Sequence, residues 1–237
     1  MEELKFDLDA LLFGKDRVEP RTRTMGAMLP VVAEPDKMPE GMEDEVTYYM
    51  YREVDRIGNI RYDITRILSL DLCTERNKTF GHVHPPSKTG TPWSEVYEVL
   101  SGEAHFLLQK IIPSGVEDAL LLSAKKGDCL LVPPGYGHVT INAGKGDLLM
   151  ANLVSDGFEA DYSIYAQRRG ACFYEMLDGK LVKNEMHYGS QFGLREMASA
   201  KFSSQFGCFE PFKKGNLLEV AKNPKAIEFL EKPEMFC

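Results

Sequence analysis

Residues 127–142, GDCLLVPPGYGHVTIN, decide the fold that this sequence predicts. Glycine and proline enclose the short apolar run CLLV at offsets that are typical of tight turns. The turns indicate a buried strand followed by a second strand, with a histidine where the second strand begins. The pattern is G-D-x4-P-x-G-x2-H-x3-N, formed by Gly127, Asp128, Pro133, Gly135, His138 and Asn142.

The chain on both sides of this stretch has the same character. From about residue 47 to 151, short runs rich in β-branched and aromatic residues alternate with Gly, Pro, Asn and Asp, at spacings of roughly 8–12 residues. This pattern predicts a β-sandwich or a small β-barrel. A further hairpin is expected around Asp178 and Gly179.

The two ends of the chain differ from this middle part. Residues 1–45 contain a short amphipathic stretch (4–13) and a segment with three prolines, which predict an extended N-terminal arm. Residues 46–189 form the predicted catalytic β-domain. Residues 190–237 have apolar residues at helical spacing, with Pro224 as a break or a new helix start, and predict a helical appendage.

Composition excludes several classes of partner. The formal net charge is -8 over 237 residues, which argues against nucleic acid or an anionic membrane as a partner. The sequence has no apolar run of 18 residues and no apolar signal-peptide core at its start. Its five cysteines are scattered without a CxxC motif, which predicts reduced thiols and a cytoplasmic protein.

The histidines suggest chemistry. His82 and His84 lie two residues apart, so in a strand both side chains point to the same face. With His138 and a carboxylate from SEVYEVLSG (94–102), they would form a mixed nitrogen and oxygen set. Such a set suits Fe(II), Mn(II), Ni(II) or Zn(II). Either Glu95 or Glu98 could supply the carboxylate, on opposite faces of the strand, and the E-x6-G spacing to Gly102 favours Glu95.

These two stretches, HxH…E…G and G-D…P-x-G-x2-H, resemble the paired motifs of the cupin superfamily. The resemblance implies an all-β, jelly-roll-like small barrel with one divalent metal inside, Fe(II) in first place, bound by His82, His84, Glu95 and His138. This chain has ten residues between His84 and Glu95 (85–94), more than cupins commonly have, which predicts a longer loop at the barrel mouth.

A narrower resemblance covers about residues 65–162. KTFGHVHP, SEVYEVLSG and VPPGYGHVTINAG are similar to the cupin-type glucose-6-phosphate isomerases. The resemblance implies a phosphate site near Thr65, Thr79, the amide of Gly81 and Tyr162. The family typically has a histidine two residues before this tyrosine, where this chain has Ala160.

The implied reaction moves a hydrogen between C1 and C2 of a sugar phosphate. Glu95 is the candidate for carrying the carbon-bound proton, and Tyr97 the candidate for a hydroxyl donor to the sugar. Alternatively, hydrogen moves as hydride and Glu95 only orients the substrate. Two other functions stay open: a metal-dependent dioxygenase or decarboxylase, and a non-enzymatic sugar-binding cupin. We also expect a homodimer.

The remaining conspicuous residues are expected to have structural roles. His105 is expected to be structural and His187 to lie on the surface. Trp93 is expected either to cover the pocket or to lie at a subunit interface. The sequence RTRT at 21–24 is expected to form a solvated turn.

Overall fold

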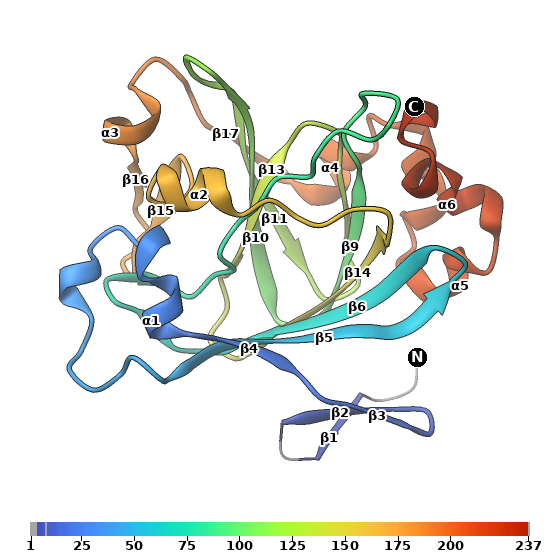
Figure 1. The fold of residues 1–237 in the computed structure, drawn as a ribbon, viewed down its shortest axis with the longest axis horizontal. Coiled ribbons are helices and arrows are strands. Elements are labelled where there is room, and N and C mark those ends of the chain that lie inside the picture. The colour runs from blue at the N-terminus through green and yellow to red at the C-terminus, as the bar shows by residue number, and fades with distance from the viewer. Residues whose placement is uncertain (1–3, 8, 237) are drawn as a thin grey trace.

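The computed structural model describes residues 4–7 and 9–236 and is built mainly of two β-sheets (Figure 1). The larger sheet has the strand order β12-β9-β14-β6-β5-β4, and the smaller has the order β13-β10-β11-β17. Neighbouring strands are antiparallel, except that β17 runs parallel to β11. The strands of the larger sheet are β4 (Arg21–Thr24), β5 (Val46–Ile57), β6 (Ile60–Ile67), β9 (Glu95–Ser101), β12 (Cys129–Val132) and β14 (Leu148–Ser155). Those of the smaller sheet are β10 (Glu103–Ile112), β11 (Gly115–Lys125), β13 (Gly137–Asn142) and β17 (Arg195–Ala198).

This architecture confirms the all-β, jelly-roll-like class predicted from the sequence, although the two sheets do not close into one continuous barrel. The stretch 127–142 forms β12 and β13 with a turn between them, as predicted, and each strand joins a different sheet. The turn therefore carries the chain from one sheet to the other and places His138 near the start of β13.

Two hydrophobic cores lie on opposite faces of the larger sheet. Tyr97 and Val99 of β9 face the core that the two sheets share, whereas Val96 and Leu100 face a second core formed with the C-terminal helices. Six of the seven residues of β9 are buried, because both of its faces are covered. β9 therefore contributes one row of side chains to the core between the two sheets and the other row to the core under the C-terminal helices.

The N-terminal region is more ordered than the extended arm that the sequence predicted. β1 (Lys5–Asp7), β2 (Ala10–Phe13) and β3 (Asp16–Val18) form a small antiparallel sheet beside the larger one (Figure 1). The prediction of a solvated turn at 21–24 is wrong, because these residues form β4 and pair with β5. Local composition did not reveal this strand, since its pairing partner lies more than 20 residues away.

The C-terminal region follows the predicted helical pattern except at residues 195–198. Residues 195–198, which have helical spacing, form β17 instead, and α4 (Ser199–Ser203) follows directly. α5 (Leu217–Ala221) and α6 (Pro224–Glu231) confirm the helices predicted near the end of the chain. Pro224 begins α6 after an Asn223 cap, as a proline at a helix start allows.

The other elements are short. β7 (Asp71–Leu72) and β8 (Glu75–Arg76) pair with each other, and β15 (Phe173–Glu175) and β16 (Leu181–Lys183) form the hairpin predicted around Asp178 and Gly179. The remaining helices are α1 (Met25–Met28), α2 (Ser163–Gln167) and α3 (Glu185–Tyr188). Among the described residues, no helix has the length and apolar character needed to cross a membrane.

Candidate metal centre and substrate pocket

His82 and His138 are brought together by the backbone. Residue 82 forms an isolated antiparallel bridge with residue 138, in which each amide donates to the other carbonyl at 3.3 and 3.0 Å. The HxH segment therefore lies alongside the start of β13, and His82 and His84 both point into the space between the sheets. Residue 83 bridges Asp161 on the other side.

Four predicted ligands converge at this point. One ligand atom from each of His82, His84, Glu95 and His138 lies within 4.8 Å of the other three. The Nε2 atoms of His82 and His84 are 3.2 Å apart, and Glu95 Oε2 lies 3.3 Å from His84 Nε2 and 3.4 Å from His138 Nε2. Ligand atoms about 2.1 Å from one ion and at right angles lie about 3 Å apart, so these spacings suit a shared metal ion.

The hydrogen-bond pattern also fits a cation. His84 Nδ1 donates to the carbonyl of Trp93 at 3.0 Å, which leaves the lone pair of Nε2 directed into the cluster. Glu95 is 3% exposed, and its Oε2 has no hydrogen-bond partner of ordinary geometry among the described residues. A buried, unpaired carboxylate oxygen is costly unless something else satisfies it. The cluster could therefore hold a metal ion.

The protonation states match this donor set. Burial lowers the pKa of His82 well below its usual value, and its histidine neighbours lower it further. Burial likewise lowers the pKa of His138. Burial alone would raise the pKa of Glu95, but the imidazole nitrogens of His138 and His84 hold it well below the usual range. Two of the three imidazoles are thus kept neutral at pH 7 beside an ionised carboxylate, as metal ligation requires.

Glu98, the alternative ligand, faces the other way. It is buried on the side of the second core, the outer core between the larger sheet and the C-terminal helices, where its Oε2 accepts a hydrogen bond from the amide of Leu217 at 2.8 Å. That amide belongs to the first turn of α5, so Glu98 anchors the C-terminal helices. Alternation along β9 separates the two carboxylates, and it places Tyr97 on the same face as Glu95.

The inserted loop 85–94 supports the cluster. The carbonyl of Trp93 accepts the hydrogen bond from His84. The Trp93 ring also stacks on Phe158, with centroids 5.4 Å apart and an interplanar angle of 19°. Phe158 in turn contacts the His84 ring, with centroids 4.6 Å apart. The loop thus contacts His84 through the Trp93 carbonyl and supports it indirectly through Phe158. Phe158 lines the cavity and Trp93 packs behind it, and whether Trp93 covers the pocket or lies at a subunit interface stays a prediction.

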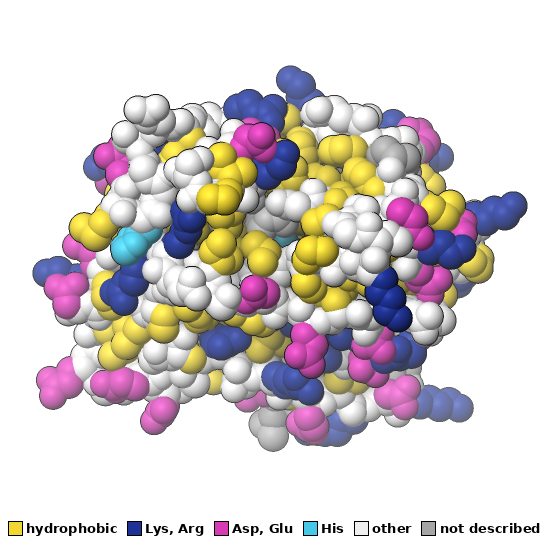
Figure 2. Space-filling view, turned by 45° about the horizontal axis from the view of Figure 1, so that its top comes forward, with side chains coloured by type: hydrophobic (Ala, Val, Ile, Leu, Met, Phe, Trp, Pro, Cys, Tyr) yellow, Lys and Arg dark blue, Asp and Glu magenta, His cyan; other side chains and the backbone are white. Residues whose placement is uncertain are grey.

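A cavity of ≈ 570 Å³ opens beside the cluster. Figure 2 shows this side of the molecule, with a hollow near its centre that hydrophobic side chains border. The cavity lining includes every residue that the resemblance assigned to substrate and catalysis: Thr65, Thr79, Gly81, Glu95, Tyr97 and Tyr162. Ala160 also lines it. Residues far apart in the sequence therefore share one space with the candidate metal centre.

Tyr97 lies against the cluster. It is 6% exposed, and its hydroxyl is 3.1 Å from His138 Nε2. Burial raises its pKa well above the usual value, and the charge of Glu95 adds to this effect. The hydroxyl therefore stays protonated at neutral pH and can act as a hydrogen-bond donor.

The cavity also contains polar residues that the sequence did not single out. Arg52, Arg61, Asn152 and Tyr48 line its wall. The guanidinium of Arg23 lies over the ring of Tyr162, 5.7 Å from its centroid, so part of the RTRT sequence supports a pocket residue. No sequence motif marked these cavity residues. Alternation along β6 and β14 does, however, place Asp63 and Asn152 on the faces of these strands that point toward the space between the two sheets.

The other histidines lie outside this cavity. His105 Nδ1 bonds Glu175 Oε2 at 2.7 Å, which agrees with the structural role expected for it. His187 lies in α3 and is partly exposed. Cys73, Cys129 and Cys172 form no disulfide among the described residues.

Comparisons with known proteins match much of this chain to one family. A family model described as Glucose-6-phosphate isomerase (GPI) matches residues 22–190. The glucose-6-phosphate isomerase of Pyrococcus furiosus is 28% identical over 128 residues, which cover 53% of this chain and 64% of that protein. The enzyme of the same name from Thermococcus litoralis is 28% identical over 141 residues, which cover 59% of this chain and 70% of that protein. The chain thus spans somewhat less than two thirds of the Pyrococcus relative.

Solved structures give a weaker likeness. An oxalate oxidase structure aligns with a TM-score of 0.38 and 14% identity, covering 50% of this chain and 56% of that chain. A variant of Bacillus subtilis oxalate decarboxylase aligns with a TM-score of 0.35 and 20% identity, covering 48% and 26%. These alignments are too distant to bear on activity. The match to the family model covers most of the chain, including all four candidate metal ligands, and the chain therefore belongs to the glucose-6-phosphate isomerase family.

Proposed function

We propose that this protein is a metal-dependent aldose–ketose isomerase that interconverts glucose 6-phosphate and fructose 6-phosphate. The observation that carries the proposal is the convergence of three histidines and Glu95 beside a cavity lined by Tyr97, in a chain of this family. The relatives named above are glucose-6-phosphate isomerases, which supports the choice of substrate. The reaction belongs to glycolysis and gluconeogenesis.

His82, His84, Glu95 and His138 would hold the metal. Three imidazole nitrogens and a carboxylate suit Fe(II), Mn(II), Ni(II) or Zn(II), of which we propose Fe(II) first. When bound, the ion supplies Lewis-acid polarisation of the sugar carbonyl. The carbonyl of Trp93 fixes the orientation of His84 for this role.

Glu95 and Tyr97 are the residues that we assign to the reaction. Glu95 is ionised, and its carboxylate can take the carbon-bound proton and return it at the neighbouring carbon, while a hydroxyl proton passes between the two sugar oxygens. In the alternative course, hydrogen passes between the carbons as hydride, and Glu95 only orients the substrate. Tyr97 keeps its proton and donates a hydrogen bond to a sugar oxygen.

The phosphate end of the sugar would lie near Thr65, Thr79, Gly81 and Tyr162. Thr79 Oγ1 accepts a bond from the Thr140 amide at 3.0 Å, so its own hydroxyl hydrogen is directed elsewhere and can reach a phosphate oxygen. Binding energy from this remote group helps to position C1 and C2 for reaction.

A coupled assay tests the proposal. Fructose 6-phosphate, the purified protein and each divalent metal in turn are combined with glucose-6-phosphate dehydrogenase, and NADPH formation is followed. His138→Ala should abolish activity and bound metal, whereas His187→Ala, outside the cavity, should keep both. If no metal supports NADPH formation, the isomerase proposal fails, and oxygen uptake with small organic acids would support a dioxygenase instead.

The course of hydrogen transfer has its own test. In D2O, incorporation of deuterium at C2 of recovered glucose 6-phosphate supports proton transfer through Glu95. Strict absence of deuterium at this carbon supports hydride transfer.

A cytoplasmic homodimer is part of the same proposal. The free thiols of Cys73, Cys129 and Cys172 and the acidic net charge are compatible with the cytoplasm. Light scattering during size-exclusion chromatography measures the mass of the particle, and a mass near that of a single 26.7 kDa chain would exclude the dimer.

A further inference from the structure

An irregularity in β5 determines where Arg52 lies. The register between β5 and β6 shifts between Tyr51 and Asp55, because residues 52–54 bulge opposite residue 63. Within the bulge, Glu53 has φ 55°, in the left-handed region. A non-glycine residue there costs on the order of 1–2 kcal/mol, so the surrounding structure must stabilise it.

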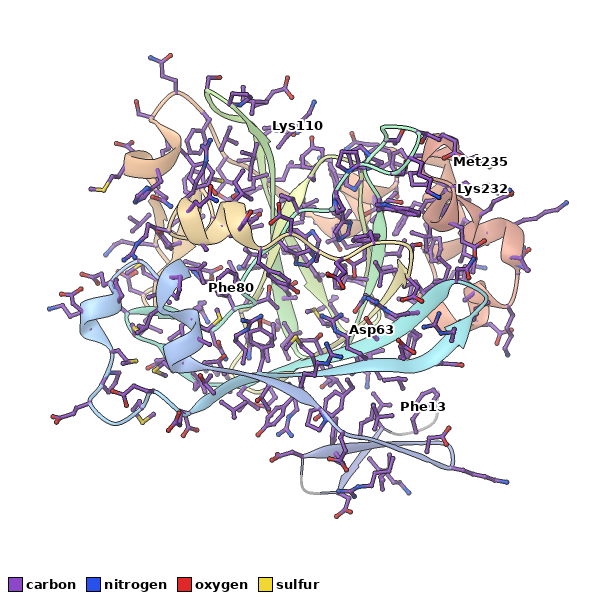
Figure 3. The ribbon with its side chains drawn as sticks, viewed as in Figure 1. Phe13, Asp63, Phe80, Lys110, Lys232 and Met235 are labelled. Atoms are coloured by element: carbon purple, nitrogen blue, oxygen red, sulfur yellow. The ribbon has the colours of Figure 1, made fainter. Side chains whose placement is uncertain are left out.

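Asp63 supplies that stabilisation. Its side chain is completely buried, and Figure 3 shows it beside β5 and β6. Asp63 Oδ1 accepts the amide of Glu53 at 2.7 Å, and Oδ2 accepts Arg52 Nη1 at 2.8 Å. One carboxylate therefore holds both the strained backbone and the side chain that the bulge redirects.

Arg52 is directed into the cavity by this arrangement. It lines the cavity together with Thr65 and Tyr162, and a third of its side chain is exposed there. Nη1 is bound to Asp63, while among residues 4–7 and 9–236 Nη2 has only a long contact of 3.7 Å with the sulfur of Met50. The guanidinium thus retains donors that can bind a ligand.

The local charge favours an anion. Asp63 Oδ2 also lies 3.3 Å from Arg61 Nη2, so two guanidiniums share one buried carboxylate. Arg61 has a second carboxylate partner, Asp156, 3.4 Å away, but that side chain is 41% exposed and lies in a more screened environment. The inner group of two arginines and Asp63 carries one excess positive charge. The cavity lining also includes Glu53, Glu95 and Glu159, of which Glu95 belongs to the candidate metal centre.

Asn152 is an independent sign of a missing ligand. It lies on β14 directly between Asp63 of β6 and Tyr97 of β9 in the sheet, and it lines the cavity. It is 2% exposed, and its Nδ2 has no hydrogen-bond partner among the described residues. A buried donor left unpaired costs about 1–3 kcal/mol, and a substrate acceptor would remove that cost.

We propose that Arg52 and Asn152 form the charged part of a subsite for the phosphoryl group of the substrate, next to Thr65. This inference rests on the proposed function, because it assigns a role to residues in the same cavity. Arg52 presents its guanidinium fork to two phosphate oxygens, and Asn152 donates one further hydrogen bond. The bulge at Glu53 and the buried carboxylate of Asp63 act as positioning elements for Arg52.

Binding of inorganic phosphate to metal-loaded protein, measured by calorimetry, tests the subsite directly. Arg52→Met and Asn152→Ala are compared with Arg66→Met, which changes an arginine of β6 that pairs with Asp147 and does not line the cavity. We expect the Kd for phosphate to rise about 10- to 100-fold in Arg52→Met and several-fold in Asn152→Ala. Arg66→Met should bind phosphate as the unaltered protein does.

Kinetics separate this inference from the proposed function. With fructose 6-phosphate, Arg52→Met should raise KM by a similar factor, while inhibition by fructose, which has no phosphate, should be unchanged. An active protein whose KM is the same with and without Arg52 refutes the subsite and leaves the isomerase intact. A protein without isomerase activity that loses phosphate binding in Arg52→Met refutes the isomerase and supports the subsite.

Two further outcomes also decide against the subsite. Absence of phosphate binding by the unaltered protein overturns it, and so does an equal loss of fructose and fructose 6-phosphate binding, which would indicate recognition of sugar hydroxyls. If Arg52→Met unfolds because Asp63 loses its partner, Asn152→Ala leaves that ion pair in place, and an unchanged Kd for phosphate in this variant then refutes the subsite.

Discussion

Glu95 and Glu98 allow the two faces of β9 to be tested separately. Glu95 faces the histidine cluster, and Glu98 accepts the amide of Leu217 in the outer core. Replacing each by glutamine keeps its size and removes its charge. We expect Glu95→Gln to weaken metal binding with little change in how the C-terminal helices pack, and Glu98→Gln to do the reverse.

The magnitudes follow from binding linkage and from hydrogen-bond strength. A metal at 1,000 times its Kd stabilises the folded protein by about 4 kcal/mol. For a chain of this length that is a rise in Tm of roughly 8–16 °C. If Glu95→Gln weakens binding about 100-fold, the stabilisation at the same concentration falls to about 1.4 kcal/mol, and the rise to roughly 3–6 °C. Glu98→Gln exchanges a charge-assisted bond for a neutral one, which costs about 1 kcal/mol, or roughly 2–4 °C in Tm.

Thermal unfolding of both variants, with and without metal, measures these effects. Metal content by elemental analysis provides a second readout that does not depend on Tm. The result that would refute the assignment is a normal metal-dependent rise in Glu95→Gln, or its loss in Glu98→Gln.

Three further predictions concern the packing around Gly81, the support of His84 and the burial of Cys172. Gly81→Ala should lower the free energy of unfolding by about 2 kcal/mol or more, because the φ of Gly81 is 85° and a Cβ there would lie 2.5 Å from an aromatic ring. Gly146→Ala, with open space around it, should leave the free energy of unfolding nearly unchanged in the same urea titration. Trp93→Leu should weaken metal binding about 10-fold by loosening Phe158, which packs on the His84 ring, and unchanged affinity in a metal titration would contradict that support. Burial raises the pKa of Cys172 to about 12, so below that pH its thiol stays protonated, and iodoacetamide at pH 8.5 should label it only after unfolding, as mass spectrometry of the native protein can check.

Much of the candidate site could be predicted because its signals are local. The two histidines of HxH share a face through the two-residue period of an extended chain, and the glycines and prolines of 127–142 determine the turn before His138. The hairpin at Asp178 and Gly179 and the helix that begins at Pro224 are likewise encoded within a few residues, and both are present in the structure.

The errors arose where distant parts of the chain decide the structure. RTRT at 21–24 is polar, but β5 offers it a free edge, and pairing with that edge makes it a strand. Residues 195–198 have helical spacing, yet they pair with β11 as a parallel strand. Backbone hydrogen bonds to an available strand can override weak local preferences, and a single sequence does not show which edges are available.

The sequence by itself determined the class of fold and the set of candidate ligands, because turns and strand alternation depend on neighbouring residues. Only the tertiary structure decided that Glu95 and not Glu98 joins the histidines, since that depends on which core covers each face of β9. It also decided that Arg52 lies in the cavity, because the bulge that redirects it is held by Asp63 from another strand. Contacts between strands are set by the packing of the whole chain, and they supply what local patterns cannot encode.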